Sequence, residues 1–167
     1  MDHSFQQVTT EDIPTIQALA SIIWKEAYRE MLSEDQIRYM LEMMYSEDVL
    51  IRELSNSVVW DLIFDGGTAC GFLSYALAQD KSVKLSKIYI KESSRGKKIV
   101  EHAIARVVRY ASANERDYVF LTVNKNNKRA IRAYEKNGFV IVSSVVTDIG
   151  GGFVMDDYVM RREVHQF

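Results

Sequence analysis

The sequence predicts an α+β domain, a three-layer α/β/α arrangement with a mixed sheet of six to seven strands and about four helices. Three patterns support this prediction. The N-terminal third has helical apolar spacing, the middle holds two β-rich runs joined by a Gly-Gly turn, and the remainder alternates strand and helix before two closing strands. A chain of 167 residues can bury one core without disulfide or metal support, so we expect a single domain over residues 1–167.

Two helices and a shorter third segment are expected in the N-terminal third. A capping threonine, two acidic residues and an early proline open the first helix, which covers residues 9–27. Ser33 opens a capping box with Gln36, and the apolar stripe of this second helix continues to Tyr45. Residues 46–55 form the short third segment.

The middle of the chain predicts a hairpin followed by a third strand. Residues 58–65 and 68–78 are rich in β-branched and aromatic side chains, and the Asp65-Gly66-Gly67 turn between them is typical of a hairpin. A third strand is expected over residues 84–91. The later elements are expected as a helix over 96–113, a strand over 117–123, a helix within 124–137, and strands over 139–147 and 153–161.

The charges are unevenly distributed, although the net charge is only −2. Residues 1–61 carry 12 acidic and 4 basic side chains, whereas residues 81–136 carry 5 acidic and 15 basic ones. A basic region favours a polyphosphate ligand and an acidic region favours a cationic one, because such fields concentrate oppositely charged ligands. We expect no nucleic-acid partner, because the basic region lacks an aromatic-interleaved stripe.

Several functional classes are disfavoured by the composition. No apolar stretch approaches the roughly 20 residues of a membrane helix and no signal-peptide layout opens the chain, so we expect a cytoplasmic location without a membrane partner. Cys70, the only cysteine, lies at the start of an expected strand and is predicted to be buried and inert. No metal site is expected, because metal-ligand spacing is absent from the three histidines, His3, His102 and His165.

Residues 124–139 set a polar turn, a short helix and a strand start in one register, N-x-x-N-x-x-A-I-x-x-Y-x-K-x-G-F. Asn127 can cap the helix with its side-chain oxygen, Ile131 and Tyr134 share the inward face, and Gly138 follows as the C-terminal stop. The pattern closely resembles the last cofactor-binding motif of the GCN5-related N-acetyltransferase (GNAT) superfamily. The resemblance covers essentially the whole chain and implies the GNAT fold, with acetyl-CoA as co-substrate.

The resemblance also implies where the cofactor pyrophosphate rests. It would lie on backbone amides where a strand turns into its helix, a place that favours anions because the N–H groups are unpaired. The family motif is R/Q-x-x-G-x-G/A, and here Lys98 and Val100 replace its two later small residues. We expect the lysines to compensate by their charge. The residues of this turn are Arg95, Gly96, Lys97, Lys98, Ile99 and Val100.

Further site residues follow from the same resemblance. Asn127 would contact the cofactor near its pantetheine arm, and Tyr134 would place its hydroxyl near the thioester sulfur as general acid. Lys136 would touch the phosphates or complement the helix dipole. The strand residues whose backbone would hydrogen-bond the pantetheine arm, as if it were an added strand, are Ile88, Tyr89 and Ile90.

The general base stays open at the level of sequence. Many relatives place a glutamate on the strand entering the site, but residues 85–89 contain no carboxylate. Deprotonation of an amine could run through water, through Tyr89, or through an acid of the front half such as Glu26, Glu30 or Asp61.

The front half mixes aromatic and acidic side chains, and it looks like that of the bacterial spermidine/spermine acetyltransferases, as does the 87–91 strand. Carboxylates and aromatic faces suit ammonium groups. We therefore expect an N-acetyltransferase that moves the acetyl group directly to a primary amine of a small molecule, with a polyamine as candidate. Direct transfer is favoured because no Cys–His or Ser–His motif is visible for a covalent acyl-enzyme.

Two alternatives stay open at this point. One is a non-catalytic CoA-binding or regulatory module, motivated by Lys98, Val100 and the absent strand carboxylate. The other is an enzyme that acetylates protein N-termini or lysines. The apolar strand over residues 153–160 could also pair across a homodimer.

Overall fold

The computed structural model describes residues 3–165, whose strands are hydrogen-bonded in the order β1-β2-β3-β4-β5-β7-β6. The pairing of β4 with β5 is parallel, whereas β1 with β2, β2 with β3, β5 with β7, and β6 with β7 are antiparallel. The mixed sheet expected from the sequence is thus confirmed, with seven strands.

The elements follow the expected sequence of helices and strands closely. The strands are β1 (His3–Gln7), β2 (Val59–Asp65), β3 (Thr68–Ala78), β4 (Ser82–Ile90), β5 (Tyr118–Asn124), β6 (Val140–Gly150) and β7 (Phe153–Glu163). The helices are α1 (Ile13–Tyr28), α2 (Glu34–Tyr45), α3 (Glu47–Ser55), α4 (Ile99–Ala113) and α5 (Lys128–Lys136), with short 3-10 turns η1 (Thr10–Asp12) and η2 (Glu92–Ser94). No helix of the described part is long and apolar enough to cross a membrane.

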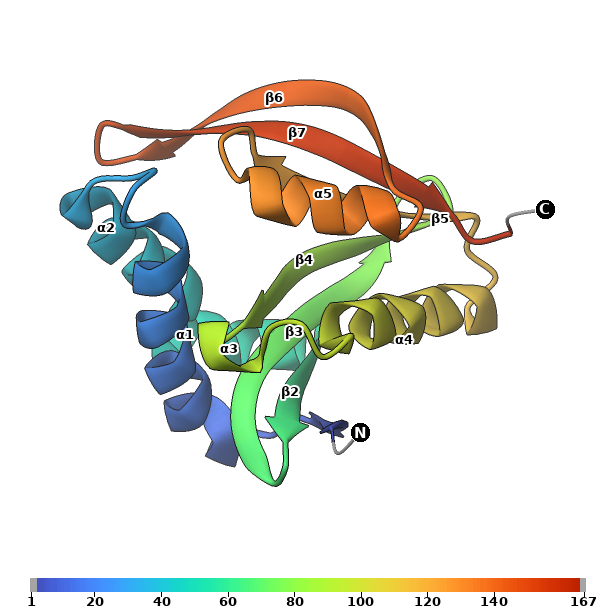
Figure 1. Ribbon diagram of the computed structural model, residues 1–167, viewed down its shortest axis with the longest axis horizontal. Helices are drawn as coiled ribbons and strands as arrows, with labels where there is room; N and C mark the ends of the chain where they lie inside the picture. Colours follow the sequence, from blue (N-terminus) through green and yellow to red (C-terminus); the bar gives the residue numbers. More distant parts are fainter. Residues whose placement is uncertain (1–2, 166–167) are drawn as a thin grey trace. The chain divides into compact units, whose positions relative to one another are not determined.

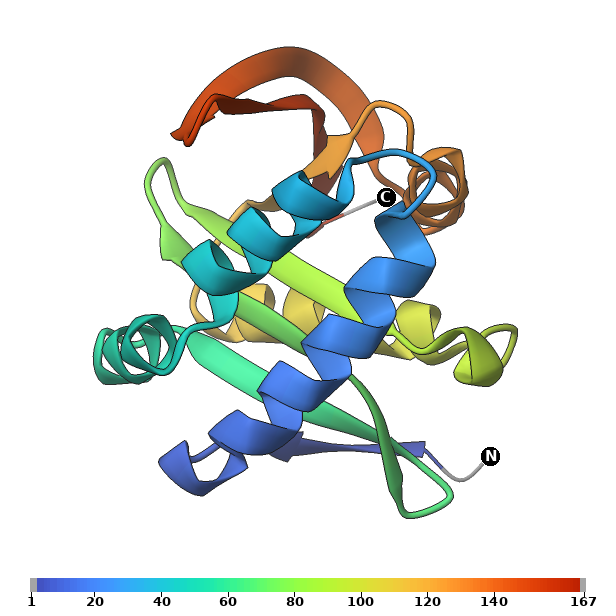
Figure 2. The same cartoon turned by 90° about the vertical axis from the view of Figure 1, so that its left-hand side faces the viewer.

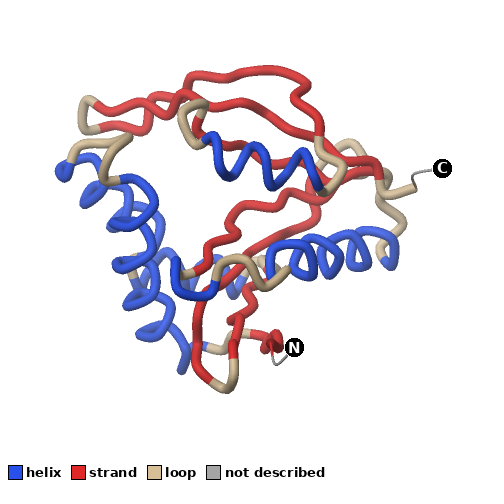
Figure 3. Tube along the Cα trace, in the orientation of Figure 1, coloured by secondary structure: helices blue, strands red, loops and turns tan. Residues whose placement is uncertain are grey.

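Two compact units make up the chain. Figure 3 shows the helices, strands and loops along the trace. Unit 1 comprises the described residues up to Tyr75 together with Lys87–Ile99. Unit 2 comprises Ala76–Ser86 and the described residues from Val100 onward. The expectation of a single domain over the whole chain stays a prediction.

In unit 1, helices α1 and α2 lie over one face of strands β2 and β3 (Figure 2). The inward stripe of α1 contributes Ile16, Ile23 and Trp24, each at most 2% exposed. Leu62 of β2 and Phe72 of β3 are equally buried. Since these are the apolar positions that recur at helical and strand spacing, removal of their surface from water stabilises this layer.

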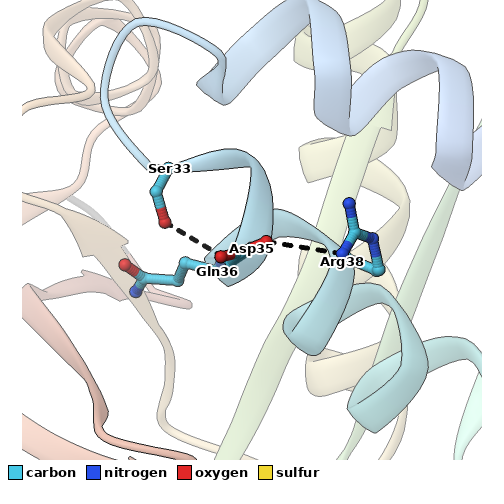
Figure 4. A network of polar contacts seen from close by, with 4 residues as sticks. All are labelled: Ser33, Asp35, Gln36 and Arg38. Carbon is cyan, nitrogen blue, oxygen red and sulfur yellow. Dashed lines mark hydrogen bonds and ion pairs between the residues drawn. The ribbon is translucent and has the colours of Figure 1, made fainter.

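The N-terminus of α2 shows why the second helix begins where the sequence predicts. Ser33 Oγ accepts a hydrogen bond from the backbone N–H of Gln36 at 3.1 Å, and Asp35 pairs with Arg38 one turn later at 3.4 Å (Figure 4). The serine thereby satisfies an amide that the first turn leaves without a helical partner.

Unit 2 contains α4, β5 and α5, followed by the long hairpin of β6 and β7 (Figure 1). Strand β7 pairs with β5 along one edge and with β6 along the other. The β5 pairing covers residues 157–163 of β7 and the β6 pairing covers residues 153–161, so both edges of β7 are paired over residues 157–161. A homodimer stays a prediction, with β6 as the strand at the end of the sheet.

Several elements differ from the expectation; for example, β6 and β7 continue to Gly150 and Glu163. Helix α4 begins at Ile99 rather than at residue 96, because Gly96 and Lys98 have left-handed backbone angles, φ 82° and 61°, that end any helical run. Strand β4 begins at Ser82, two residues early. Strand β1 was not expected, because its five residues become a strand only through pairing with β2.

Candidate active site

The end of β4 approaches β3 without an intervening side chain. A Cβ atom on Gly71 would collide with the carbonyl oxygen of Tyr89 and would lie 3.1 Å from the Cα atom of Ile90. The backbone N–H of Lys91 donates to the carbonyl oxygen of Cys70 at 2.8 Å. Gly71 therefore sets the place of the β4 backbone over the residues expected to hold the pantetheine arm.

The same contacts bury Cys70, which is 3% exposed. Burial raises the pKa of its thiol, and a neutral thiol is a poor nucleophile. This agrees with the inert role expected for it.

The turn after β4 exposes basic residues on an irregular backbone. Gly96 and Lys98 adopt left-handed conformations, and residues 96–98 are exposed, whereas Ile99 is 2% exposed and anchors the start of α4. Left-handed residues turn backbone amides toward a common side and form concave anion sites. The turn fits phosphate groups. Lys98 holds a left-handed conformation there that glycine would adopt more freely.

One cation of this turn already has an anionic partner. Lys97 Nζ lies 2.7 Å from Asp65 Oδ2, and Ser94 Oγ donates to the same oxygen at 3.0 Å. These contacts, the lysine first, lower the pKa of the Asp65 carboxyl. Asp65 offsets the charge of Lys97, which leaves Arg95 and Lys98 as the other cationic side chains of the turn.

A cluster of aromatic rings fills unit 1 beneath helices α1 and α2. Neighbouring rings of the cluster are tilted or edge to face, and their centroids lie 5.6–6.2 Å apart. Its members are Trp24, Tyr45, Trp60, Phe72 and Tyr89. We call these five residues the aromatic cluster.

Lys87 of β4 points its ammonium group onto this cluster. Its Nζ lies 5.2 Å from the ring centroid of Trp60 and 5.6 Å from that of Tyr45. Cation–π attraction of this kind shows that the ring faces accept an ammonium group. Beside them, burial raises the pKa of the Tyr45 hydroxyl well above its ordinary value, so this phenol stays neutral and accepts the indole N–H of Trp24 at 2.9 Å.

Three of the four side chains considered as general base have hydrogen-bond partners within unit 1. Tyr89 and Tyr28 bring their hydroxyls to 3.1 Å, and Glu26 accepts the backbone N–H of Glu92 at 3.3 Å. Asp61 is fully buried and accepts the hydroxyl of Tyr75 at 2.9 Å. Glu30 lies exposed just after α1.

Helix α5 in unit 2 is built as the sequence predicts. Asn127 Oδ1 accepts the backbone N–H of Ala130 at 3.3 Å. At the other end, the backbone N–H groups of Gly138 and Phe139 donate to the carbonyls of Glu135 and Tyr134, a Schellman motif with Gly138 at φ 88°. Capping at both ends fixes a short helix that would be marginal alone.

The side chain of Tyr134 is held by packing on this helix. Its ring lies edge to face with that of Phe139, with centroids 5.8 Å apart, and Phe139 is only 2% exposed. Tyr134 itself is half-buried, as is Asn127, whereas Lys136 is exposed. A supported, partly accessible phenol suits proton donation to a leaving group.

Sequence reasoning missed one acidic residue of unit 2. Asp157 of β7 is 5% exposed, and burial raises the pKa of its carboxyl, with the neighbouring Asp156 adding to the rise. The adjacent Asp156 instead pairs with Lys125 at 2.8 Å. The sequence showed the alternation along this strand, but it did not show that Asp157 is buried.

The residues expected at the site fall into two groups. Unit 1 holds Ile88, Tyr89 and Ile90 at the end of β4, followed by Arg95, Gly96, Lys97, Lys98 and Ile99. Unit 2 holds Val100, Asn127, Tyr134 and Lys136. Each group has the local geometry expected of it, an exposed basic turn in the first and a capped helix bearing a phenol in the second.

An exposed basic turn before a helix suits a ligand with several phosphates, and a phenol on a capped helix can give a proton to a thiolate leaving group. On a mixed sheet of this strand order, these are features expected of an acetyltransferase that uses acetyl-CoA. The chain belongs to the acetyltransferase (GNAT) family, whose model matches residues 17–139. It is an N-acetyltransferase, and acetyl-CoA is its acetyl donor.

Individual relatives agree with this assignment. The chain is 26% identical to the spermidine N(1)-acetyltransferase of Thermoplasma acidophilum over 93% of its own length and 97% of that protein. The crystal structure of the PaiA N-acetyltransferase from Thermoplasma acidophilum, in complex with coenzyme A, has a similar fold, with a TM-score of 0.82, 23% identity and coverage of 98% of this chain and 99% of that one. A GCN5-related N-acetyltransferase from Rhodopseudomonas palustris has a TM-score of 0.82 at 16% identity, covering 98% of this chain and 96% of that one.

Proposed function

We propose that the protein transfers the acetyl group of acetyl-CoA directly to a primary amine of a small molecule, and that a polyamine is the acceptor to test first. One observation carries this proposal, the similarity over nearly the whole chain to a relative named spermidine N(1)-acetyltransferase. The excess of 12 acidic over 4 basic side chains in residues 1–61 supports a cationic acceptor.

Tyr134 is the proposed general acid. Acetyl-CoA, when bound, supplies the acetyl group as an activated thioester whose sulfur leaves as a thiolate. The Tyr134 hydroxyl would give that sulfur its proton, a contribution typically of about 10²–10⁴ in rate. The Phe139 contact and the Schellman motif support this role because they fix the ring on its helix.

Other residues are proposed to bind rather than react. The backbone of Ile88–Ile90 would hydrogen-bond the pantetheine arm, and Asn127 would contact the cofactor near it. Arg95, Lys98 and the amides of residues 96–100 would hold the pyrophosphate, with Lys97 contributing less because Asp65 pairs with it. Lys136 would act on the phosphates or on the end of its helix dipole.

The test is calorimetric titration with acetyl-CoA, followed by an assay of CoA-thiol release with spermidine, other primary amines and peptides. Tyr134→Phe is the informative variant, and Tyr118→Phe is a control that removes a phenol outside α5. We expect binding of acetyl-CoA by all three proteins and slow turnover only in Tyr134→Phe. Full turnover by Tyr134→Phe would refute the acid role, and preference for peptides over every small amine would refute the acceptor class.

A further inference from the structure

The sequence does not identify the general base of the acetyl transfer. Amines with an ordinary pKa are protonated near neutral pH, so a group must remove a proton before the nitrogen can attack. Residues 85–89 of β4 contain no carboxylate. Among the front-half acids, Asp61 holds the hydroxyl of Tyr75 and Glu26 holds the amide of Glu92, so both already have structural partners.

Asp157 differs from these acids because its buried carboxylate has no hydrogen-bond partner in the described part of the chain. It is 5% exposed, and within residues 3–165 no hydrogen bond or ion pair to its side chain is formed. A carboxylate that is largely removed from water and has no hydrogen-bond partner costs stability. Such groups gather at functional sites, where a proton acceptor of unusual basicity is useful.

Strand register places Asp157 beside the segment that leads into α5. Its Cα pairs with that of Asn124 at the end of β5 and with that of Val145 of β6. Directly opposed residues of an antiparallel pair share a face of the sheet, so Asp157 and Asn124 lie on one face. Asp156 lies on the other face, where Lys125 pairs with it.

The same segment carries the proposed acid within unit 2. The backbone N–H of Lys125 donates to the carbonyl of Asp156 at 3.2 Å, and that of Asn127 donates to Asn124 at 2.9 Å. Asn127 then caps α5, on which Tyr134 lies seven residues later, a rise of roughly 10 Å. A long side chain on a helix leans back toward the N-terminus, which directs Tyr134 toward this capped end.

We propose that Asp157 is the general base of the acetyl transfer, an inference that rests on the proposed function above. Its carboxylate takes one proton from the ammonium group of the acceptor, directly or through a water, and becomes a carboxylic acid. The freed nitrogen lone pair attacks the acetyl carbon, and the carbon–sulfur bond breaks with its electron pair on sulfur. Tyr134 protonates that sulfur, the nitrogen loses its second proton to water as the amide forms, and Asp157 and Tyr134 re-equilibrate with solvent.

The raised pKa of the Asp157 carboxyl agrees with this role. Burial is its largest cause, Asp156 adds to it, and Lys125 opposes it. A base whose pKa lies nearer the working pH than an ordinary carboxyl accepts a proton more readily. The rate should therefore fall as the pH drops through this raised pKa.

The test compares Asp157→Asn with Asp156→Asn, which removes the neighbouring carboxylate on the opposite face. We expect Asp157→Asn to bind acetyl-CoA as the wild type does, to lose about 10²-fold in kcat/KM for the amine, and to recover as the pH approaches the pKa of the amine. Asp156→Asn should keep the wild-type rate near neutral pH, with the acid limb of its pH profile moved to lower pH, because Asp156 no longer raises the pKa of the Asp157 carboxyl. A wild-type rate and pH profile in Asp157→Asn would overturn the proposal.

A second measurement uses the wild-type protein, so it does not depend on the folding of a variant. Carbon-13 NMR of carboxyl-labelled protein should show the Asp157 resonance titrating above the ordinary aspartate range and shifting when spermidine is added to the complex with CoA. A resonance that titrates normally and ignores spermidine would overturn the proposal. A wild-type protein that binds acetyl-CoA but acetylates no amine would instead refute the proposed function itself, and the role of Asp157 with it.

Discussion

The change Lys98→Gly should stabilise the protein, because Lys98 has a left-handed backbone angle of φ 61°. An L-residue in this conformation costs about 1–2 kcal/mol, whereas glycine avoids the cost but loses about 0.5–1 kcal/mol through its freedom in the unfolded chain. The midpoints of these two ranges leave a net gain of about 0.75 kcal/mol, within limits of about 0–1.5 kcal/mol. In a chain of 150–250 residues each kcal/mol moves Tm by about 2–4 °C, so a rise of about 1.5–3 °C is expected.

The matched control is Lys98→Ala, which removes the same cationic side chain but keeps the cost of the left-handed conformation. Both variants lose one cation from the turn, so the salt dependence of acetyl-CoA binding should weaken in both. Thermal and urea unfolding of the three proteins rank their stability, and calorimetry ranks their affinity. If Lys98→Gly is no more stable than Lys98→Ala, the reasoning about this turn is refuted.

The other predictions concern the supports of unit 1. Gly71→Ala should destabilise the protein by about 1–3 kcal/mol, since the new methyl group meets the backbone of Tyr89, and an unchanged Tm would contradict this. Asp65→Asn should lower Tm at neutral pH. Because Lys97 lowers the pKa of the Asp65 carboxyl, the wild-type advantage is present above the ordinary value of about 3.9 and should fade as the pH falls further, so melting curves that stay apart at low pH would argue against the pair. Cys70 should react with a thiol reagent only on unfolding; rapid labelling of the native protein would disprove its burial.

Local chemistry explains why most element boundaries could be predicted from the sequence. Ser33 and Asn127 cap their helices through side chains that act within three residues. The turn at Gly66 and Gly67 takes its shape from two left-handed residues, φ 59° and 83°. Such features depend on neighbours along the chain, and the sequence displays them directly.

Features that depend on distant residues were not predictable in the same way. Asp65 pairs with a lysine 32 positions away, which changes how much charge the basic turn offers to phosphates. The sequence did not show that β7 is paired on both edges over residues 157–161, with β5 on one side and β6 on the other. Asp157 pairs with Asn124 of β5 and with Val145 of β6 and is only 5% exposed, an environment that depends on residues distant in the sequence.

The acetyl transfer is tested most directly by the rate of CoA release from acetyl-CoA with spermidine and a panel of primary amines, with acetylated products identified by mass spectrometry. We expect stoichiometric N-acetylation of a small amine by the wild type and a loss of about 10²-fold or more in kcat for Tyr134→Phe at unchanged acetyl-CoA affinity. Binding of acetyl-CoA without any acetylated amine, or full turnover without the Tyr134 hydroxyl, would contradict it.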